Sequence, residues 1–318
     1  MYTPPGMFVP GLVALFMLLV GPAHSEGTVK AYPRVTAPTS RDRVLIIAPH
    51  IDDEVIGAGG YVLDAVANGA DVYIAFLTAG DCNRFSALLV NKTLGPTASS
   101  YLSVGRTRIA EAHVAMKLLG VAPDHYFILG YPDRGLKAIL DDRTAVIRSR
   151  ATKKRAVPYE EAMSPGSPYS FANLMADVEQ VIDIAKPTTI IAPVPFDQHG
   201  DHAAAAEITD IAIAGLDQQP RRLGYLVHAG SRIRRSFVRV PERALKPPNG
   251  MRSLTWATYS LTPAVQKRKD AVLQTYKSQG PYVSLLRNAF VRTNELFFVY
   301  DDAVSVNAIA QPRTAIAR

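Results

Sequence analysis

The chain has 318 residues, of which 48% are hydrophobic and 20% are charged, a composition typical of a globular protein with a substantial core. The formal net charge is +7, but no zinc-finger spacing, RNP-like aromatic motif or helix-turn-helix signal accompanies it, so we expect no nucleic-acid partner. Cys82 is the single cysteine, which excludes an intramolecular disulfide, and we expect its thiol to be buried and inert.

Residues 1–25 have the composition of a signal peptide. They contain no Asp, Glu, Lys or Arg, and the apolar run Phe8–Val20 is too short for a comfortable membrane span. The small residues Ala23 and Ser25 suit a cleavage site, so we expect export to the periplasm or the medium. Because no Lys or Arg precedes the apolar run, an uncleaved membrane anchor is the alternative. Residues 26–41 are expected to form an irregular lead-in.

The first predicted strand covers residues 44–48, a β-branched apolar run of the kind buried on both faces of a parallel sheet. Pro49 ends it. One imidazole and three carboxylates then follow within five residues: His50, Asp52, Asp53 and Glu54. Acids also suit a helix N-terminus, but three carboxylates beside a buried strand repel one another, and a divalent cation would relieve this repulsion.

Helices and strands alternate along the rest of the chain. We expect helices at 55–68, 105–119, 170–185, 201–216 and 262–277, and strands at 72–77, 126–129, 188–192, 223–228 and 296–300. This alternation predicts an α/β, Rossmann-like three-layer fold with a mostly parallel central sheet and an active site at the carboxyl ends of the strands. A single domain is expected over residues 42–302, followed by a flexible tail at 303–318.

Residues 137–169 interrupt this alternation and predict a loop insertion. The segment carries a run of cations, namely Arg143, Arg148, Arg150, Lys153, Lys154 and Arg155, and several prolines follow it. A solvated surface is the simplest interpretation, and contact with an anionic glycan or lipid surface through such basic loops is the alternative.

A second polar cluster, Asp197-Gln198-His199-Gly200-Asp201-His202, follows the apolar strand at 188–192. A lone His is usually a structural residue, and we expect this of His228. Two such clusters, each placed directly after a buried strand, are instead typical of residues that converge on one metal ion.

The two clusters resemble the signature motifs of the PIG-L/LmbE-like zinc-dependent N-acetylglucosaminyl deacetylase family, (A/P)HPDDE and HPDH. The matching residues are Pro49-His50-Ile51-Asp52-Asp53-Glu54 and His199-Gly200-Asp201-His202, and segments 106–111, 130–133 and 267–279 resemble further parts of the family. The resemblance spans about residues 42–300. Ile51 and Gly200 stand where the family usually has Pro, which affects loop stiffness rather than the ligand set.

The resemblance implies a catalytic zinc site. His50, Asp53 and His202 would bind Zn²⁺, although Fe²⁺ would also fit this ligand set. Asp52 would be the general base, and His199 would stabilise the oxyanion or protonate the leaving amine. Glu54 and Asp201 would orient the ligands or hold the start of a helix.

The expected reaction is hydrolysis of the N-acetyl group of an N-acetylglucosamine-containing glycan, glycolipid or glycoconjugate, with release of acetate. Asp133, at the end of the strand at 126–129, would bind sugar hydroxyls by the same resemblance. Arg84, just beyond the strand at 72–77, is a further candidate for contact with the substrate.

Alternatives remain open from the residues alone. Glycines 57, 59 and 60 follow a strand but come too late for a dinucleotide-binding fingerprint. Two His and one carboxylate also suit iron(II) oxygenases, which usually have a β-sandwich fold. An exported metal-containing carbohydrate-binding protein without catalysis, or an amidase of the same fold for another N-acyl substrate, would share the ligands. A binding protein would not need Asp52.

Overall fold

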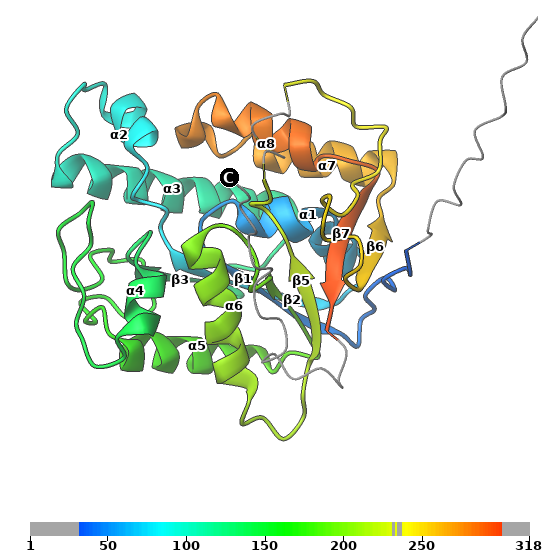
Figure 1. Cartoon of the computed structure of the whole chain (residues 1–318), viewed down its shortest axis with the longest axis horizontal. Coiled ribbons are helices and arrows are strands. Elements are labelled where there is room, and N and C mark those ends of the chain that lie inside the picture. The colour runs from blue at the N-terminus through cyan, green and yellow to red at the C-terminus, as the bar shows by residue number, and fades with distance from the viewer. Residues whose placement is uncertain (1–31, 231–232, 234–236, 301–318) are drawn as a thin grey trace, which may run out of the picture. The chain divides into compact units, whose positions relative to one another are not determined.

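The computed structural model describes residues 32–230, 233 and 237–300 (Figure 1). The expected signal peptide at 1–25, residues 26–31 of the lead-in and the expected tail at 303–318 lie outside the described residues. Among the residues that are described, none of the helices has the length and apolar character needed to cross a membrane.

Seven strands form one sheet in the order β3-β2-β1-β4-β5-β7-β6. Their bounds are β1 Arg43–Ala48, β2 Asp71–Thr78, β3 Tyr126–Tyr131, β4 Thr189–Pro193, β5 Arg221–Tyr225, β6 Trp256–Ser260 and β7 Asn294–Val299. The pairs from β3 to β5 are parallel, and β7 runs antiparallel to β5 and β6. The mostly parallel sheet is therefore confirmed, and β6 is a strand that the sequence pattern did not reveal.

Helices cover both faces of this sheet (Figure 1). The upper layer in that view holds α1 (Asp53–Ala67), α3 (Ala98–Leu119), α7 (Pro263–Leu273) and α8 (Tyr282–Phe290), and the lower layer holds α4 (Leu136–Asp141), α5 (Phe171–Ala185) and α6 (Gly200–Ile213). The short α2 (Arg84–Asn91) packs on α3, and the 3-10 turn η1 (Lys277–Gln279) precedes α8. This is the three-layer α/β architecture that the alternation predicts.

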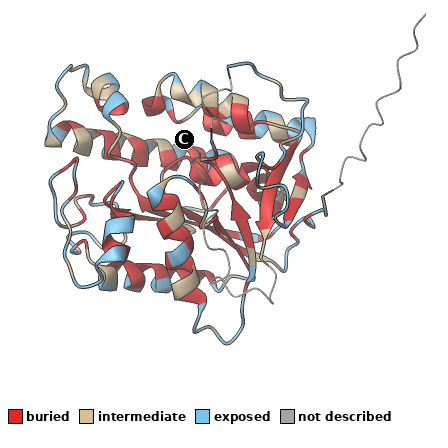
Figure 2. Cartoon of the chain, in the orientation of Figure 1, coloured by how far each residue is buried: buried red, intermediate tan, exposed pale blue. Residues whose placement is uncertain are grey.

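The central strand β1 positions the site. Residues 44–48 are almost fully buried, because β2 and β4 flank the strand and helices cover both faces (Figure 2). The chain connects β1 to β2 on one side, whereas β4 on the other side comes from much later in the sequence. The order of strands thus reverses between β1 and β4, and a crevice opens at their carboxyl ends, where open α/β sheets bind ligands.

The glycines of α1 serve packing rather than phosphate binding. A Cβ atom on Gly57 would lie 2.5 Å from the ring of Tyr225, and one on Gly60 would meet the side chain of Leu261. Tyr225 in turn donates a hydrogen bond from its hydroxyl to the carbonyl of Ile47, 2.9 Å away. Close packing against neighbouring side chains explains why Gly57 and Gly60 have no side chain. These glycines therefore give no support to a dinucleotide-binding site.

The basic segment is anchored to the body of the protein. Helix α4 occupies the start of the expected insertion at 137–169. Residues 142–170, all of which are described, form no further helix or strand, and one isolated bridge joins Ala156 to Pro168. Val157, Tyr159 and Tyr169 are nevertheless buried, and the Tyr159 hydroxyl donates to Asp81 at 2.5 Å. Buried side chains that follow the cationic run thus hold the segment against the domain, while the cations stay at the surface.

Candidate metal centre and active site

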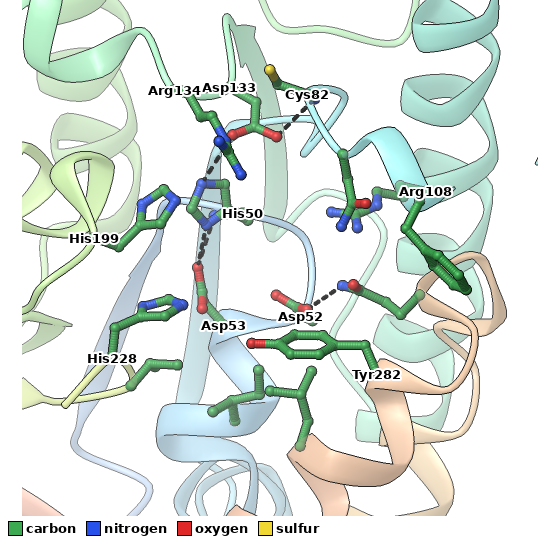
Figure 3. A pocket seen from close by; sticks show the side chains of 16 residues that line it. His50, Asp52, Asp53, Cys82, Arg108, Asp133, Arg134, His199, His228 and Tyr282 are labelled. Carbon is green, nitrogen blue, oxygen red and sulfur yellow. Dashed lines mark hydrogen bonds and ion pairs between the residues drawn. The ribbon is translucent and has the colours of Figure 1, made fainter. Parts of the chain in front are cut away.

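Both polar clusters face one cavity of about 420 Å³ at the carboxyl end of the sheet (Figure 3). The loop after β1 contributes His50 and Asp52, α1 contributes its first residue, Asp53, and the loop after β4 contributes His199. Residues from α1, α2, α3, η1, α8 and the loops after β2, β3 and β5 complete the wall: Ile56, Cys82, Asn83, Phe85, Arg108, Asp133, Arg134, Val227, His228, Gln279, Tyr282 and Leu286. The expected position of the site is thus the position of this cavity.

Asp53 lies between two histidines from the two clusters. Its Oδ2 atom is 3.0 Å from Nδ1 of His50 and 3.1 Å from Nε2 of His202. Burial would raise the pKa of Asp53, but the neighbouring His202 and His50 hold it well below its usual range, so the carboxylate is ionised. The structure therefore brings together the three side chains expected to bind the ion.

The far nitrogens of both histidines face other carboxylates. Nε2 of His50 lies 3.3 Å from Asp201 and 3.4 Å from Asp133, and Nδ1 of His202 lies 3.3 Å from Asp197. Metal-binding histidines commonly have such carboxylate partners, which fix the ring orientation. Asp201 is placed as expected for an orienting group, and Asp197 is an orienting residue that the sequence reasoning did not identify.

The donor set fits a divalent metal ion. Both ring nitrogens of His202 are buried and make no hydrogen bond, although carboxylate oxygens lie nearby. Buried polar atoms without a partner are costly, and a bound cation would satisfy Nε2. His50 and His202 also form a compact group with His199, whose ligand atoms all lie within 4.8 Å of one another. A site with two or three imidazoles and one carboxylate is borderline-soft and suits Zn²⁺ or Fe²⁺.

Two further groups of three share these residues. Asp197, His202 and His228 form one, and His50, Asp133 and Asp201 form the other. In the group of His50, Asp133 and Asp201, both carboxylates lie near Nε2 of His50, whereas Asp53 lies near Nδ1 of the same ring. Asp133 and Asp201 therefore contact the imidazole that would bind the metal ion through its other nitrogen.

Asp52 sits beside this centre in a backbone conformation that is rare for a non-glycine residue. Its φ is 135°, and its side chain does not cap α1, which rules out the capping interpretation for this acid. Gln279 donates a hydrogen bond to its Oδ2 atom. Burial, together with the neighbouring Asp53, raises the pKa of Asp52 to about 7. The group can therefore exchange a proton near neutral pH.

Glu54 holds the loop rather than facing the cavity. It is fully buried, accepts a hydrogen bond from the hydroxyl of Tyr276, and accepts another from the backbone N–H of Asp52 at 3.1 Å. Burial raises the pKa of Glu54 to about 8. These contacts place Glu54 as a support for the backbone of Asp52, which agrees with the expectation that it holds the start of the helix.

His199 is the N-cap of α6. Its Nδ1 atom accepts a hydrogen bond from the backbone N–H of Asp201 at 3.3 Å. Burial and the neighbouring His50 and His202 lower the pKa of His199 to about 4, so its imidazole is neutral at pH 7. With Nδ1 acting as acceptor, the proton is on Nε2, and this N–H can serve as a donor.

The residues expected near the sugar are only partly in place. Asp133 lines the cavity and accepts a hydrogen bond from the backbone N–H of Cys82 at 2.8 Å, whereas Arg84 is exposed and does not line it. Arg108 lies there instead, on α3 and only 4% exposed. Its segment, 106–111, carries the family resemblance, and this was the signal that could have identified it. Cys82 also borders the cavity and is only half-buried, so the expectation of a buried thiol is wrong, although this partial burial raises its pKa to about 11.

His228 lines the cavity as well, although a purely structural role was expected. Its Nδ1 atom lies 3.2 Å from Asp197, and its ring centroid is 5.0 Å from that of His199. Its position at the end of the strand expected at 223–228 was the only sequence signal for it, and β5 itself ends at Tyr225.

Comparison with known proteins gives a consistent family. The model of the PIG-L family, described as GlcNAc-PI de-N-acetylase, matches residues 45–213. A 1D-myo-inositol 2-acetamido-2-deoxy-alpha-D-glucopyranoside deacetylase of Kribbella flavida is 29% identical over 177 residues, which are 54% of each chain. The chain spans about half or less of the length of the curated relatives it matches.

Solved structures share the fold at lower identity. The N,N'-diacetylchitobiose deacetylase of Pyrococcus horikoshii is 18% identical with a TM-score of 0.51, and the match covers 83% of this chain and 86% of that one. The 4-carboxy-2-hydroxymuconate hydratase of Pseudomonas putida is 14% identical with a TM-score of 0.52, covering 82% and 98%. Because a hydratase shares the architecture, the fold alone does not determine the reaction.

Proposed function

Since the chain belongs to the PIG-L family, we propose that it is a zinc-dependent deacetylase that removes the N-acetyl group from an N-acetylglucosamine-containing glycan, glycolipid or glycoconjugate and releases acetate. The observation that carries the proposal is the position of the Asp53 carboxylate between His50 and His202, with Asp52 beside it in the same cavity. The names of the relatives, which act on an inositol-linked amino sugar and on diacetylchitobiose, support this substrate class.

The protein would hold the ion through Nδ1 of His50, Oδ2 of Asp53 and Nε2 of His202. A Zn²⁺ ion bound there would supply Lewis-acid polarisation of the amide carbonyl and of the attacking water. The chain itself supplies the orientation, because Asp201 and Asp197 face the far sides of the two imidazoles.

In this proposal Asp52 accepts the proton of the attacking water and then gives it to the amine that leaves when the C–N bond breaks. Its carboxylate lines the cavity, and the amide of Gln279 and the backbone contact of Glu54 hold it in place. The strained backbone at Asp52 fits this role, because such strain tends to persist where the surrounding structure fixes a functional side chain. A protein that only bound sugar would need the metal ligands but would have no use for this base.

His199 stabilises the developing oxyanion. Its neutral imidazole donates from Nε2, while the backbone N–H of Asp201 fixes Nδ1 as an acceptor. A fixed donor placed where negative charge develops contributes more to the transition state than to the bound substrate. Asp133 and Arg108, which line the same cavity, are placed to bind hydroxyl groups of the sugar.

A screen for acetate release tests the proposal. Purified protein is incubated with N-acetylated monosaccharides, chito-oligomers and inositol-linked N-acetylglucosamine, with and without a chelator. We expect about one zinc per chain by elemental analysis and acetate release that the chelator abolishes. An amidase of the same fold with another substrate would release no acetate from any sugar but would hydrolyse other N-acyl compounds. Acetate release that persists in the chelator would disprove the metal mechanism.

Variants separate the ligands from the base. Replacing His50, Asp53 or His202 by Ala is expected to remove metal and activity together. Asp52→Asn is expected to keep the metal and to lower kcat by roughly a hundredfold or more. An Asp52→Asn protein as fast as wild type would remove Asp52 from the mechanism.

We also propose that the protein is exported, on the composition of residues 1–25. Edman sequencing of the secreted or periplasmic protein is expected to begin at or near Glu26. Recovery of a chain that starts at Met1 in the membrane fraction would support the anchor instead, and recovery in the cytoplasm would refute export.

A further inference from the structure

A second cavity adjoins the first. It has a volume of about 450 Å³, and Arg134 and His199 line both cavities. Its other charged lining residues come from α4, α6 and the anchored basic segment, namely Lys137, Asp141, Arg150 and Asp201. A substrate whose N-acetyl group lies at the metal centre could therefore extend into this cavity past Arg134 and His199.

The acids of this second cavity are already paired. Both oxygens of Asp141 bind the ammonium group of Lys137, at 2.6 and 2.7 Å. Asp201 is almost fully buried; it accepts hydrogen bonds from the backbone N–H groups of Arg134 and Leu136 at 2.5 and 3.1 Å and faces His50. Neither carboxylate is left to neutralise a further cation.

Two guanidinium groups lack a counter-charge. The side chains of Arg134 and Arg150 make no hydrogen bond or ion pair with any described residue. Arg148 and Arg155 of the basic segment also form no ion pair with a described residue, but their guanidinium groups donate to the carbonyls of Lys153 and Val146, a contact that Arg134 and Arg150 do not make. The guanidinium groups of Arg134 and Arg150, which line the second cavity, are therefore free to bind an anion.

The backbone at Arg134 explains its position. Its φ is 60°, in the left-handed region, and the turn from Pro132 to Gly135 is closed by a 2.9 Å hydrogen bond. The N–H of Arg134 points to Asp201, so its side chain stands at the boundary of the two cavities, next to Asp133 and His199 (Figure 3). Such a left-handed residue costs energy, and here the contact with Asp201 maintains it.

We propose that the second cavity is a subsite for an anionic group, a carboxylate or a phosphate, on the part of the substrate attached to the sugar. The planar guanidinium fork binds both anions through two parallel hydrogen bonds, and two forks on one cavity can share a single anion. This inference rests on the proposed deacetylase function and adds a charge requirement to its substrate. It assigns Arg134 and Arg150 to substrate selection and not to the chemical step.

Matched glycosides test the subsite. The 4-carboxyphenyl and 4-carbamoylphenyl glycosides of N-acetylglucosamine differ from each other by one negative charge and hardly in shape. Each is prepared as both anomers, and 4-phosphonooxyphenyl glycosides test a phosphate in place of the carboxylate. For the preferred anomer we expect kcat/KM for acetate release to be about tenfold higher for the anionic glycosides than for the neutral one. The double variant Arg134→Gln/Arg150→Gln should reduce this ratio to about one. Arg148→Gln, on the same segment but outside the cavity, should keep the wild-type ratio.

A binding measurement separates the subsite from the reaction. Analogues with methylsulfonyl in place of acetyl are not hydrolysed, and isothermal titration gives their Kd for the wild type and the variants. Preference for the anionic analogue in a protein that releases no acetate would refute the proposed function and keep the subsite. Equal affinity for charged and neutral analogues, or a preference that survives both substitutions, would refute the subsite. Inorganic phosphate that binds as tightly as the anionic analogues would reassign the cavity to free anions and overturn the inference.

Discussion

Replacing Lys269 by Met removes the cation from a buried ion pair that supports the helix carrying Asp53. Lys269 on α7 and Glu295 on β7 lie 2.6 Å apart, with only 1% and 2% of their side-chain surfaces exposed. Lys269 also donates to the carbonyl of Ile56 at 3.1 Å, and Glu295 accepts from the N–H groups of Gly60 and Tyr61 at 2.6 and 2.9 Å. The pair thus binds three backbone groups in the middle of α1.

The magnitude follows from what each substitution leaves buried. Lys269→Met leaves the Glu295 carboxylate without a counter-charge, and the loss of one partner from a buried pair costs about 3 to 5 kcal/mol. Glu295→Gln leaves a buried ammonium with one carbonyl, at a similar cost. The double variant buries no unpaired charge and loses mainly one acceptor for a backbone N–H, so we expect it to cost only about 2 kcal/mol. The two single effects are therefore expected to be strongly non-additive.

Urea unfolding followed by the fluorescence of Trp256 provides the assay. Trp256 is the only tryptophan of the chain, and it lies on β6, which pairs with β7. Lys137→Met is the control, since the Lys137–Asp141 pair is exposed and its loss should change the free energy of unfolding by less than about 0.5 kcal/mol. A double variant whose cost equals the sum of the two single costs would refute the reasoning that an unpaired buried charge dominates.

Three further predictions concern individual positions. Gly200→Pro should raise the free energy of unfolding by about 1 kcal/mol and the melting temperature by about 2 °C. Gly200 is the first residue of α6, where proline is favoured, and the extended backbone of His199 suits a following proline. A lower melting temperature would contradict this. Gly57→Ala should lower the free energy of unfolding by about 1 to 3 kcal/mol in urea titration, because its Cβ would overlap the ring of Tyr225, and an unchanged midpoint would argue against that contact. Burial raises the pKa of Asp270, but hydrogen bonds from two arginines outweigh this and lower it, so its stabilising contribution is present above about pH 4 and is lost as the pH falls through the lowered pKa. Asp270→Asn should therefore destabilise the protein less at pH 3 than at pH 7, and an equal loss at both values would exclude the linkage.

The sequence by itself determined the α/β class and the edge of the sheet where the site lies. Apolar β-branched runs such as residues 44–48 can be recognised locally, because burial on both faces leaves no polar position in the strand. Polar residues directly after two such runs must lie at the same edge when the strands are parallel. The position of His50, Asp53 and His202 was therefore accessible from the pattern and from the family motifs together.

Elements whose signal depends on contacts were missed. Helix α2 has eight residues, β6 has five and lies at the end of the sheet beside β7, and α8 follows a 3-10 turn, so none has the length or periodicity that marks the other elements. The same holds for single side chains. Arg108 reaches the cavity from α3, whereas Arg84, which is nearer the motif in sequence, points to solvent.

Tertiary structure alone decided which side chains meet across the sheet. Asp197 joins His202 to His228 because β5 lies beside β4, and Glu295 reaches the backbone of α1 because β7 returns antiparallel to β5. Such contacts depend on the distance between packed layers and on rotamers fixed by neighbours, and no periodicity along the chain encodes either. Sequence thus located the chemistry at one edge of the sheet, and packing chose the residues that orient it.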